Sequence, residues 1–217
     1  MSAPVISEGT IPFIVGGETY STWYKLFGSP ESTTRPLVVL HGGPGASHDY
    51  MLPLADLAQS DRPVTVILYN QLGTARSKYP DLLKKDPSFW TIELFISELE
   101  NLPTFFNISY SFDLIGHSWG ATLAAELISP PTEVIFSLSQ AELEGGKVQK
   151  GIRDNGMAND WSIIDRIHEI RVPTLLINGK DDFMSDEVCM PYFLVRWCSL
   201  WFCMCMCLPN PMYDVLN

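Results

Sequence analysis

The segment that most constrains the fold is 113–120, which reads DLIGHSWG. A short apolar stretch typical of a strand precedes it, and a run of strong helix formers, 121–127, follows it. Gly116, Ser118 and Gly120 fit the pattern G-x-S-x-G, in which the serine lies on a tight strand-to-helix turn that needs small neighbours. We therefore predict that Ser118 is a nucleophile raised above a sheet. The alternative is an ordinary glycine-flanked turn.

The backbone around this turn offers sites for a developing negative charge. The N–H of Trp119 would lie at the N-terminus of the predicted helix, where an oxyanion can be held. A second glycine-rich segment, HGGPG at 41–45, follows the apolar run 37–40. Its glycines would let the backbone approach a reacting carbonyl with an N–H free to donate. The alternative for HGGPG is a glycine-rich turn after a strand.

Hydrophobic periodicity predicts the remaining elements. Segments 10–15 and 20–27 read as an antiparallel edge hairpin joined by a turn at 16–18, because side chains alternate along the second segment. Continuous apolar runs predict buried strands at 37–40 and 64–69, and further strands are predicted at 110–115 and 134–138.

Two helices are expected before the serine turn. Segment 49–59 is predicted to pack through Leu52, Ala55 and Leu57. Segment 90–102 has apolar residues at helical spacing, which indicates an amphipathic helix. The carboxylates of Glu93, Glu98 and Glu100 are expected to lie on its solvated face rather than to act as acid–base groups.

Composition narrows the class of protein. A chain of 217 residues with 46% apolar and 18% charged residues suits one folded domain with a sizeable core. Its net charge of −11 disfavours nucleic acids and anionic membranes as partners. No basic segment followed by an apolar stretch opens the chain, so we expect a cytoplasmic protein.

The five cysteines fall near the C-terminus, as Cys189, Cys198, Cys203, Cys205 and Cys207. A disulfide framework would spread its cysteines along the chain. The alternation C-M-C-M-C is not a zinc spacing, because thiolates at i and i+2 are poorly placed for a closed tetrahedral site. We expect neither disulfides nor a metal.

Four collinear motifs together resemble the proline iminopeptidase family of α/β hydrolases: HGGPG, YNQLGTARS, GHSWGATLAAE and DWSIIDRIHEIRVPTLLINGKDD. The match runs from about residue 8 to about 193, with one large gap. The resemblance implies an α/β-hydrolase fold, with a mostly parallel sheet and an N-terminal antiparallel hairpin. It also implies release of an N-terminal residue, typically proline, from small peptides or amides, with no metal or organic cofactor.

The resemblance also implies residue roles. Ser118, on the strand-to-helix turn, would be the nucleophile. The oxyanion hole would be formed by Gly43, with Gly42 as second choice, and by Trp119. The family's acid follows a strand at 174–177 and falls on Asp182. Asp181 is the runner-up, and a helix N-cap or turn aspartate is the structural alternative for Asp182.

The sequence departs from the family pattern at two places within the core region. Asn70 stands where the family has an aspartate that helps to fix its loop. The family inserts a helical cap after the strand 134–138, but only 139–159 separate that strand from the resumed match, which suggests a reduced cap. Glu142 and Glu144 lie near the start of that gap, and we interpret them as surface charges.

The third departure is the tail. The family's catalytic histidine follows the acid, whereas no histidine occurs after His168 in these 217 residues. We therefore predict a core at 1–193, with an incomplete C-terminal end, and a divergent, non-native tail at 194–217. A membrane anchor is the alternative for the tail, but Pro191 and Arg196 interrupt the apolar stretch.

These observations predict a serine hydrolase of aminopeptidase type, impaired because its catalytic histidine is absent. One alternative is a general esterase or amidase with an open site. The other is a catalytically dead scaffold. The oligomeric state is left open.

Overall fold

The computed structural model describes residues 6–29, 34–109 and 111–129, together with Arg166 and Ile170. Almost all of them belong to one compact unit, which includes the described residues up to 127. The predicted strands at 134–138 and 174–177, the shortened cap region, Asp181, Asp182, the five cysteines and the tail lie outside the described residues. The predicted boundary at 193/194 stays a prediction for the same reason.

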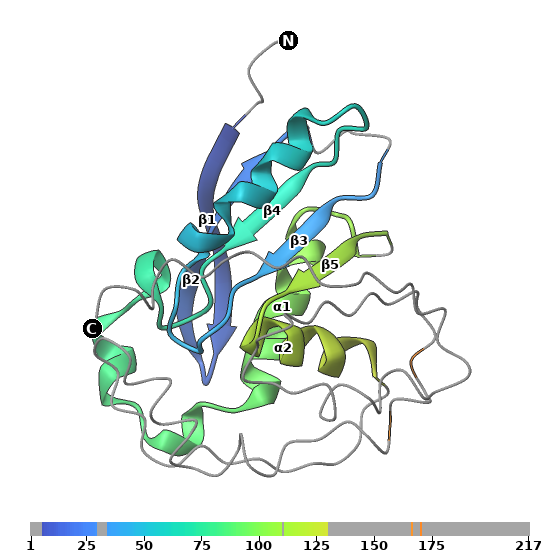
Figure 1. Cartoon of the computed structure of the whole chain (residues 1–217). Coiled ribbons are helices and arrows are strands. Elements are labelled where there is room, and N and C mark those ends of the chain that lie inside the picture. Colours follow the sequence, from blue (N-terminus) through green and yellow to red (C-terminus); the bar gives the residue numbers. More distant parts are fainter. Residues whose placement is uncertain (1–5, 30–33, 110, 130–165, 167–169, 171–217) are drawn as a thin grey trace, which may run out of the picture. The chain divides into compact units, whose positions relative to one another are not determined.

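Within the part of the chain that the structure describes, five strands form one mixed sheet in the order β1-β2-β4-β3-β5 (Figure 1). β1 (Ile6–Val15) and β2 (Glu18–Phe27) form an antiparallel hairpin, and β2 pairs antiparallel with β4 (Val66–Tyr69). β3 (Leu37–Leu40) pairs in parallel with β4 on one side and with β5 (Asp113–Gly116) on the other. The hairpin and the buried strands predicted at 37–40 and 64–69 are therefore present, and β5 falls at the strand predicted at 110–115 but is only half-buried.

The hairpin is closed by two glycines. Gly16 and Gly17 have φ values of 60° and 79°, a conformation that glycine adopts without steric cost. Positive φ at both central residues gives a turn whose twist matches the strands, and Val15 then pairs with Glu18. The turn is one residue shorter than predicted, because Glu18 already belongs to β2.

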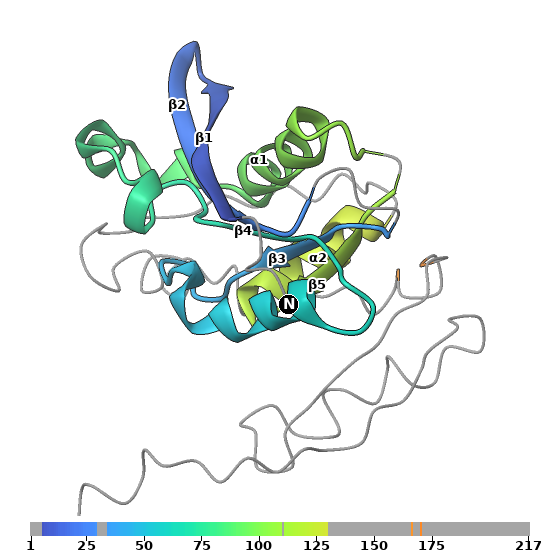
Figure 2. The same ribbon diagram turned by 90° about the horizontal axis from the view of Figure 1, so that it is seen from above.

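The central strands bury both of their faces, which explains their continuous apolar runs. Val38 and Leu40 belong to a core cluster that includes residues of α1 (Ile92–Phe105). Val39, between them, belongs to a second cluster that includes residues of η1 (His48–Gln59), a 3₁₀ helix. Figure 2 shows α1 and η1 on opposite sides of the sheet.

Short 3₁₀ helices connect the larger elements of the described region, as η2 (Ala75–Ser77), η3 (Pro80–Lys84) and η4 (Pro87–Phe89). The helix predicted at 49–59 is present as η1 and buries Ala55 as expected. The prediction for Leu57 is wrong, since this residue is 38% exposed. Met51 packs into the core instead.

Helix α1 begins where the sequence provides a cap. The hydroxyl of Thr91 accepts a hydrogen bond from the Leu94 N–H at 3.1 Å, which satisfies one of the free donors of the first turn. The helix continues past its predicted end to Phe105. Among the described residues, no helix is both long enough and apolar enough to cross a bilayer.

The prediction that Glu98 faces solvent is wrong. Glu93 and Glu100 are exposed as expected, but Glu98 is 0% exposed. The physical reason is helical geometry: Glu98 lies three residues after Phe95 and four before Leu102, and both of those residues are buried on the core-facing stripe.

Candidate active site

Ser118 lies at the junction between β5 and α2 (Trp119–Ile128) in a strained backbone conformation. Its φ is 53°, in the left-handed region that a non-glycine residue rarely occupies, and the residue is exposed. Such strain costs on the order of 1–3 kcal/mol and is typically retained at functional sites. The Ser118 carbonyl accepts hydrogen bonds from the N–H groups of Ala121 and Thr122 at 2.8 and 3.2 Å, which anchor the turn to α2.

The two glycines beside the serine are required by close backbone contacts. A Cβ at Gly116 would collide with the backbone of Gly120, and one at Gly120 would collide with the carbonyl of Leu40. The His117 N–H also donates to the Leu40 carbonyl, at 3.2 Å. The strand-to-helix turn at 116–120, called the elbow below, is therefore packed directly against the end of β3, as G-x-S-x-G requires.

We expect Gly120→Ala to lower the free energy of unfolding by about 3 kcal/mol, because the added methyl group meets backbone that cannot move without separating β3 from α2. Urea unfolding of the purified variant measures this loss. Gly9→Ala is the matched control, since its Cβ would meet only the Tyr24 ring, at 3.0 Å from the hydroxyl oxygen. Equal losses in the two variants would show that the junction is not tightly packed.

Two of three backbone N–H groups near the elbow have no hydrogen-bond acceptor among the described residues. The Gly42 N–H donates to the hydroxyl oxygen of Tyr50 at 2.5 Å. Neither the Gly43 N–H nor the Trp119 N–H has an acceptor among the described residues. This arrangement supports Gly43 over Gly42 as partner of Trp119 in an oxyanion hole, an assignment that stays a prediction.

The Tyr50 hydroxyl also contacts His117. The oxygen of Tyr50 lies 3.0 Å from His117 Nδ1, and the two rings pack edge to face with centroids 5.3 Å apart. Partial burial raises the pKa of Tyr50, so its hydroxyl is neutral at physiological pH. The imidazole of His117 is thus held by Tyr50 above Gly42, although it precedes Ser118 directly in the chain.

Buried hydrogen bonds through Gln71 join the glycine-rich loop at 41–45 to the elbow. The indole Nε1–H of Trp119 donates to Gln71 Oε1 at 2.9 Å, and Gln71 Nε2 donates to the His41 carbonyl at 2.8 Å. The Gln71 backbone N–H donates to His41 Nε2 at 3.1 Å. Sequence reasoning assigned no role to Gln71, and only its place in the motif YNQLGTARS pointed to it.

These contacts fix the protonation state of His41. Because Nε2 accepts a hydrogen bond, the ring proton lies on Nδ1, which donates to the Gly42 carbonyl at 2.9 Å. Burial lowers the pKa of His41 to about 4, so the ring stays neutral at physiological pH. His41 therefore supports the glycine loop, and both of its nitrogens are occupied.

Asn70 holds the neighbouring His48. Its Oδ1 accepts hydrogen bonds from the His48 backbone N–H at 3.1 Å and from Nδ1 at 2.9 Å. The Asn70 side-chain amide nitrogen is buried and has no hydrogen-bond partner among the described residues. A buried donor without an acceptor costs about 1–3 kcal/mol, so the amide of Asn70 is unfavourable at this position.

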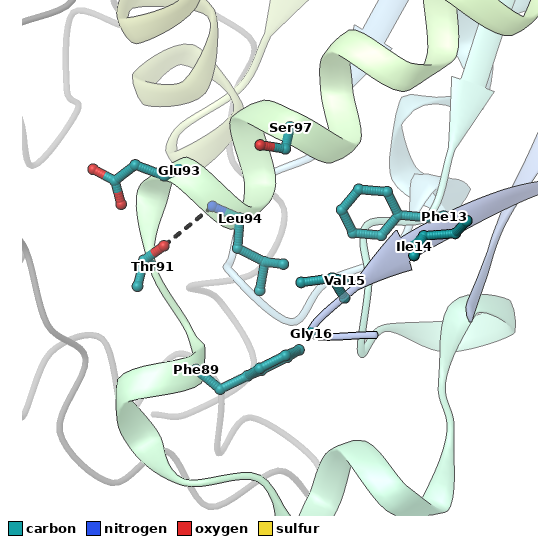
Figure 3. A pocket seen from close by; sticks show the side chains of 9 residues that line it. All are labelled: Phe13, Ile14, Val15, Gly16, Phe89, Thr91, Glu93, Leu94 and Ser97. Atoms are coloured by element: carbon teal, nitrogen blue, oxygen red, sulfur yellow. Dashed lines mark hydrogen bonds between the residues drawn. The ribbon is translucent and has the colours of Figure 1, made fainter. Parts of the chain in front are cut away.

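A depression of about 410 Å³ lies between the end of β1 and the start of α1 (Figure 3). Apolar side chains dominate its lining, among them Phe13, Val15, Phe89 and Leu94. None of the candidate catalytic residues lines it. The depression is therefore separate from the elbow.

Several predicted site residues lie outside the described part of the chain. Asp182, its neighbour Asp181 and His168 belong to that group, so the acid stays a prediction. Within the described residues, no cluster of three or more His, Cys, Asp or Glu side chains is arranged to hold a metal ion.

A family model described as "Alpha/beta hydrolase family" matches residues 37–199. The chain belongs to the α/β hydrolase family, in agreement with the mixed sheet, the elbow and the glycine loop. The predicted fold class is thereby confirmed.

The curated relatives that match are proline iminopeptidases, as the motifs predicted. The chain is 41% identical over 106 residues to the one from Lactiplantibacillus plantarum, a match that covers 48% of this chain and 34% of the relative. It is 44% identical over 102 residues to the one from Saccharolobus solfataricus, covering 47% and 31%. The chain therefore spans about a third of the length of these relatives.

Solved structures show the same fold. The proline iminopeptidase of Mycobacterium smegmatis superposes with a TM-score of 0.68 at 22% identity, over 92% of this chain and 90% of that one. The 2-hydroxy-6-oxo-6-phenylhexa-2,4-dienoate hydrolase of Rhodococcus sp. strain RHA1 superposes with a TM-score of 0.67 at 14% identity, over 94% and 91%. At such identities the likeness concerns the fold alone.

Proposed function

We propose that this chain is a serine hydrolase of aminopeptidase type, which releases an N-terminal residue, typically proline, from small peptides or amides. The observation that carries the proposal is the exposed, strained Ser118 between two glycines that admit no side chain. Two curated relatives that match this chain are proline iminopeptidases. A small-molecule substrate also suits the net charge of −11, which disfavours nucleic acid.

In the proposed reaction, the hydroxyl oxygen of Ser118 attacks the carbonyl carbon of the N-terminal residue. A histidine base takes the hydroxyl proton and later gives it to the leaving amine, while Asp182 orients that base. The N–H groups of Gly43 and Trp119 would stabilise the oxyanion. Water then releases the acyl group from the serine.

The proposal includes impaired turnover in the 217-residue polypeptide, because it offers no histidine after Asp182. Ser118 would then lack its base, while the oxyanion donors remain. The cytoplasmic location predicted from the sequence stays a prediction.

We expect Ser118→Ala to keep the fold and to abolish covalent labelling by a fluorophosphonate probe, since the probe reacts with the serine oxygen. Mass spectrometry of the intact protein measures the stoichiometry, and circular dichroism checks the fold. Ser97→Ala is a matched control on the exposed part of α1. Labelling of the Ser118→Ala variant at the wild-type stoichiometry would exclude Ser118 as nucleophile.

The exposure of Ser118 also suits a general esterase with an open site. Comparing proline nitroanilide with short-chain nitrophenyl esters separates this alternative from an aminopeptidase. A chain that hydrolyses neither substrate and resists the probe would instead be a catalytically dead scaffold.

A further inference from the structure

Glu98 is a carboxyl group buried in the core without a basic partner. It lies on α1, is 0% exposed, and forms no ion pair within the described residues. Its Oε1 accepts a hydrogen bond from the Thr22 hydroxyl at 2.5 Å, and its Oε2 accepts one from the Leu72 backbone N–H at 2.9 Å. Burying a carboxyl group costs free energy unless it is hydrogen-bonded, so these two hydrogen bonds are needed to keep Glu98 in the core.

The Leu72 contact connects Glu98 to the elbow. Leu72 follows Gln71, whose side chain accepts from the Trp119 indole at 2.9 Å and donates to the His41 carbonyl at 2.8 Å. Gln71 and Leu72 are both 0% exposed, so their backbone has little freedom to shift independently. A continuous series of buried contacts therefore runs from α1 to both sides of the candidate oxyanion hole.

A second contact joins the same two elements. The Phe95 ring, on the same face of α1 as Glu98, packs edge to face on the Trp119 ring with centroids 5.7 Å apart. Phe95 fixes the position of the indole through packing, but it supplies no direction for the Nε1–H. The hydrogen bond to Gln71 supplies that direction, and Glu98 holds the adjoining backbone.

We propose that Glu98 is a positioning residue for the Ser118 site, which fixes the Gln71–Leu72 backbone and thereby the Trp119 side of the oxyanion hole. Its catalytic consequence rests on the function proposed above. The positional coupling between Glu98 and Trp119 does not, and it can be measured without turnover.

The protonation state of Glu98 provides a signal for this coupling. Burial raises the pKa of Glu98 to about 7, and the hydrogen bonds from Leu72 and Thr22 oppose that rise. The titratable group that faces it from β4 is Tyr69, whose pKa is raised well above its usual value by burial and by the charge of Glu98. Thr22 on β2 and Leu72 carry no charge, so the comparison with a Glu98→Gln variant tests whether a spectroscopic change near pH 7 comes from Glu98.

Three variants separate the parts of this role. Glu98→Gln removes the charge but keeps an acceptor for the Leu72 N–H. Glu98→Leu removes both. Glu100→Gln is the matched control, because Glu100 is an exposed carboxylate two residues further along the same helix.

The first readout is the indole N–H resonance of Trp119 in protein carrying ¹⁵N-tryptophan, assigned with a Trp119→Phe variant. We expect this resonance to shift with a midpoint near pH 7 in the wild-type protein and in Glu100→Gln, and to stay constant in Glu98→Gln. A Trp119 resonance that does not titrate, or that titrates unchanged in Glu98→Gln, overturns the proposal.

The second readout is the rate of fluorophosphonate labelling at Ser118, measured at equal folded fraction. Loss of one oxyanion donor costs about 10²- to 10³-fold. We expect a partial loss of about tenfold in Glu98→Leu, with Glu98→Gln close to wild type. Labelling of folded Glu98→Leu at the wild-type rate overturns the proposal. If the wild-type protein does not label at all, the proposed function fails, and the indole readout alone decides on Glu98.

Discussion

The 217-residue polypeptide is expected to cleave proline nitroanilide on the order of a millionfold more slowly than the same core with a restored C-terminal segment. In the restored protein, residues 194–217 are replaced by a segment that places a histidine after a last strand. A serine hydroxyl is a weak nucleophile at neutral pH and needs a base within hydrogen-bond reach. In a well-studied triad protease, removing one triad member costs on the order of a millionfold in turnover.

The three described histidines are already engaged elsewhere. His41 uses both ring nitrogens, on Gly42 and on the Gln71 N–H, and the depression of its pKa to about 4 leaves it a poor base. His48 is buried, with Nδ1 on Asn70. His117 is exposed, but its Nδ1 lies 3.0 Å from the Tyr50 hydroxyl.

Ester substrates provide the internal control for this comparison. The N–H groups proposed as oxyanion donors belong to the retained core, so slow hydrolysis of nitrophenyl esters is expected from the 217-residue polypeptide even when amide cleavage is undetectable. Initial rates at matched folded concentration measure both. If both proteins cleave proline nitroanilide equally fast, the argument from the missing base is wrong.

The fold was predictable wherever local sequence carries a physical rule. Paired glycines at 16–17 specify a tight hairpin turn, and continuous apolar runs such as 37–40 specify strands buried on both faces. The pattern around Ser118 specifies the elbow, because only glycine fits at 116 and 120. These features depend on neighbours in the sequence, so they can be read without knowledge of tertiary contacts.

The supporting contacts of the site were not predictable in this way. Gln71 contacts His41 and Trp119, which are 30 and 48 residues away in the sequence. Asn70 was recognised as unusual, but the identity of the buried nitrogen left without a partner depends on the packing around it. Long-range contacts of this kind leave no periodic signal.

The burial of Glu98 lies between these two cases, because the sequence carries one signal for it and one against it. Its spacing from Phe95 and Leu102 places it on the buried stripe, whereas its charge indicates a solvated face. The prediction from the sequence follows the charge, and the contacts from Thr22 and Leu72 that make burial possible come from distant segments. Helical spacing therefore predicts the burial of Glu98 better than its charge does.

Replacing Glu98 by Gln is expected to change how stability depends on pH. Burial raises the pKa of Glu98 from 4.5 to about 7 in the folded protein. Between these two pH values the unfolded chain has released a proton that the folded protein still holds. The contribution of Glu98 is therefore fully present below pH 4.5, declines as pH rises, and is lost once pH passes about 7.

The expected size of this loss is about 3 kcal/mol, since each unit of pKa shift corresponds to about 1.4 kcal/mol. Gln cannot ionise, so Glu98→Gln should gain about this amount relative to wild type between pH 4.5 and pH 8. Urea unfolding at both pH values measures it, and using the difference between the two proteins cancels the other titrating groups. Glu100→Gln should show no such gain, because that carboxylate is exposed. A constant difference between wild type and Glu98→Gln across this range would mean that Glu98 titrates alike in the folded and unfolded chain.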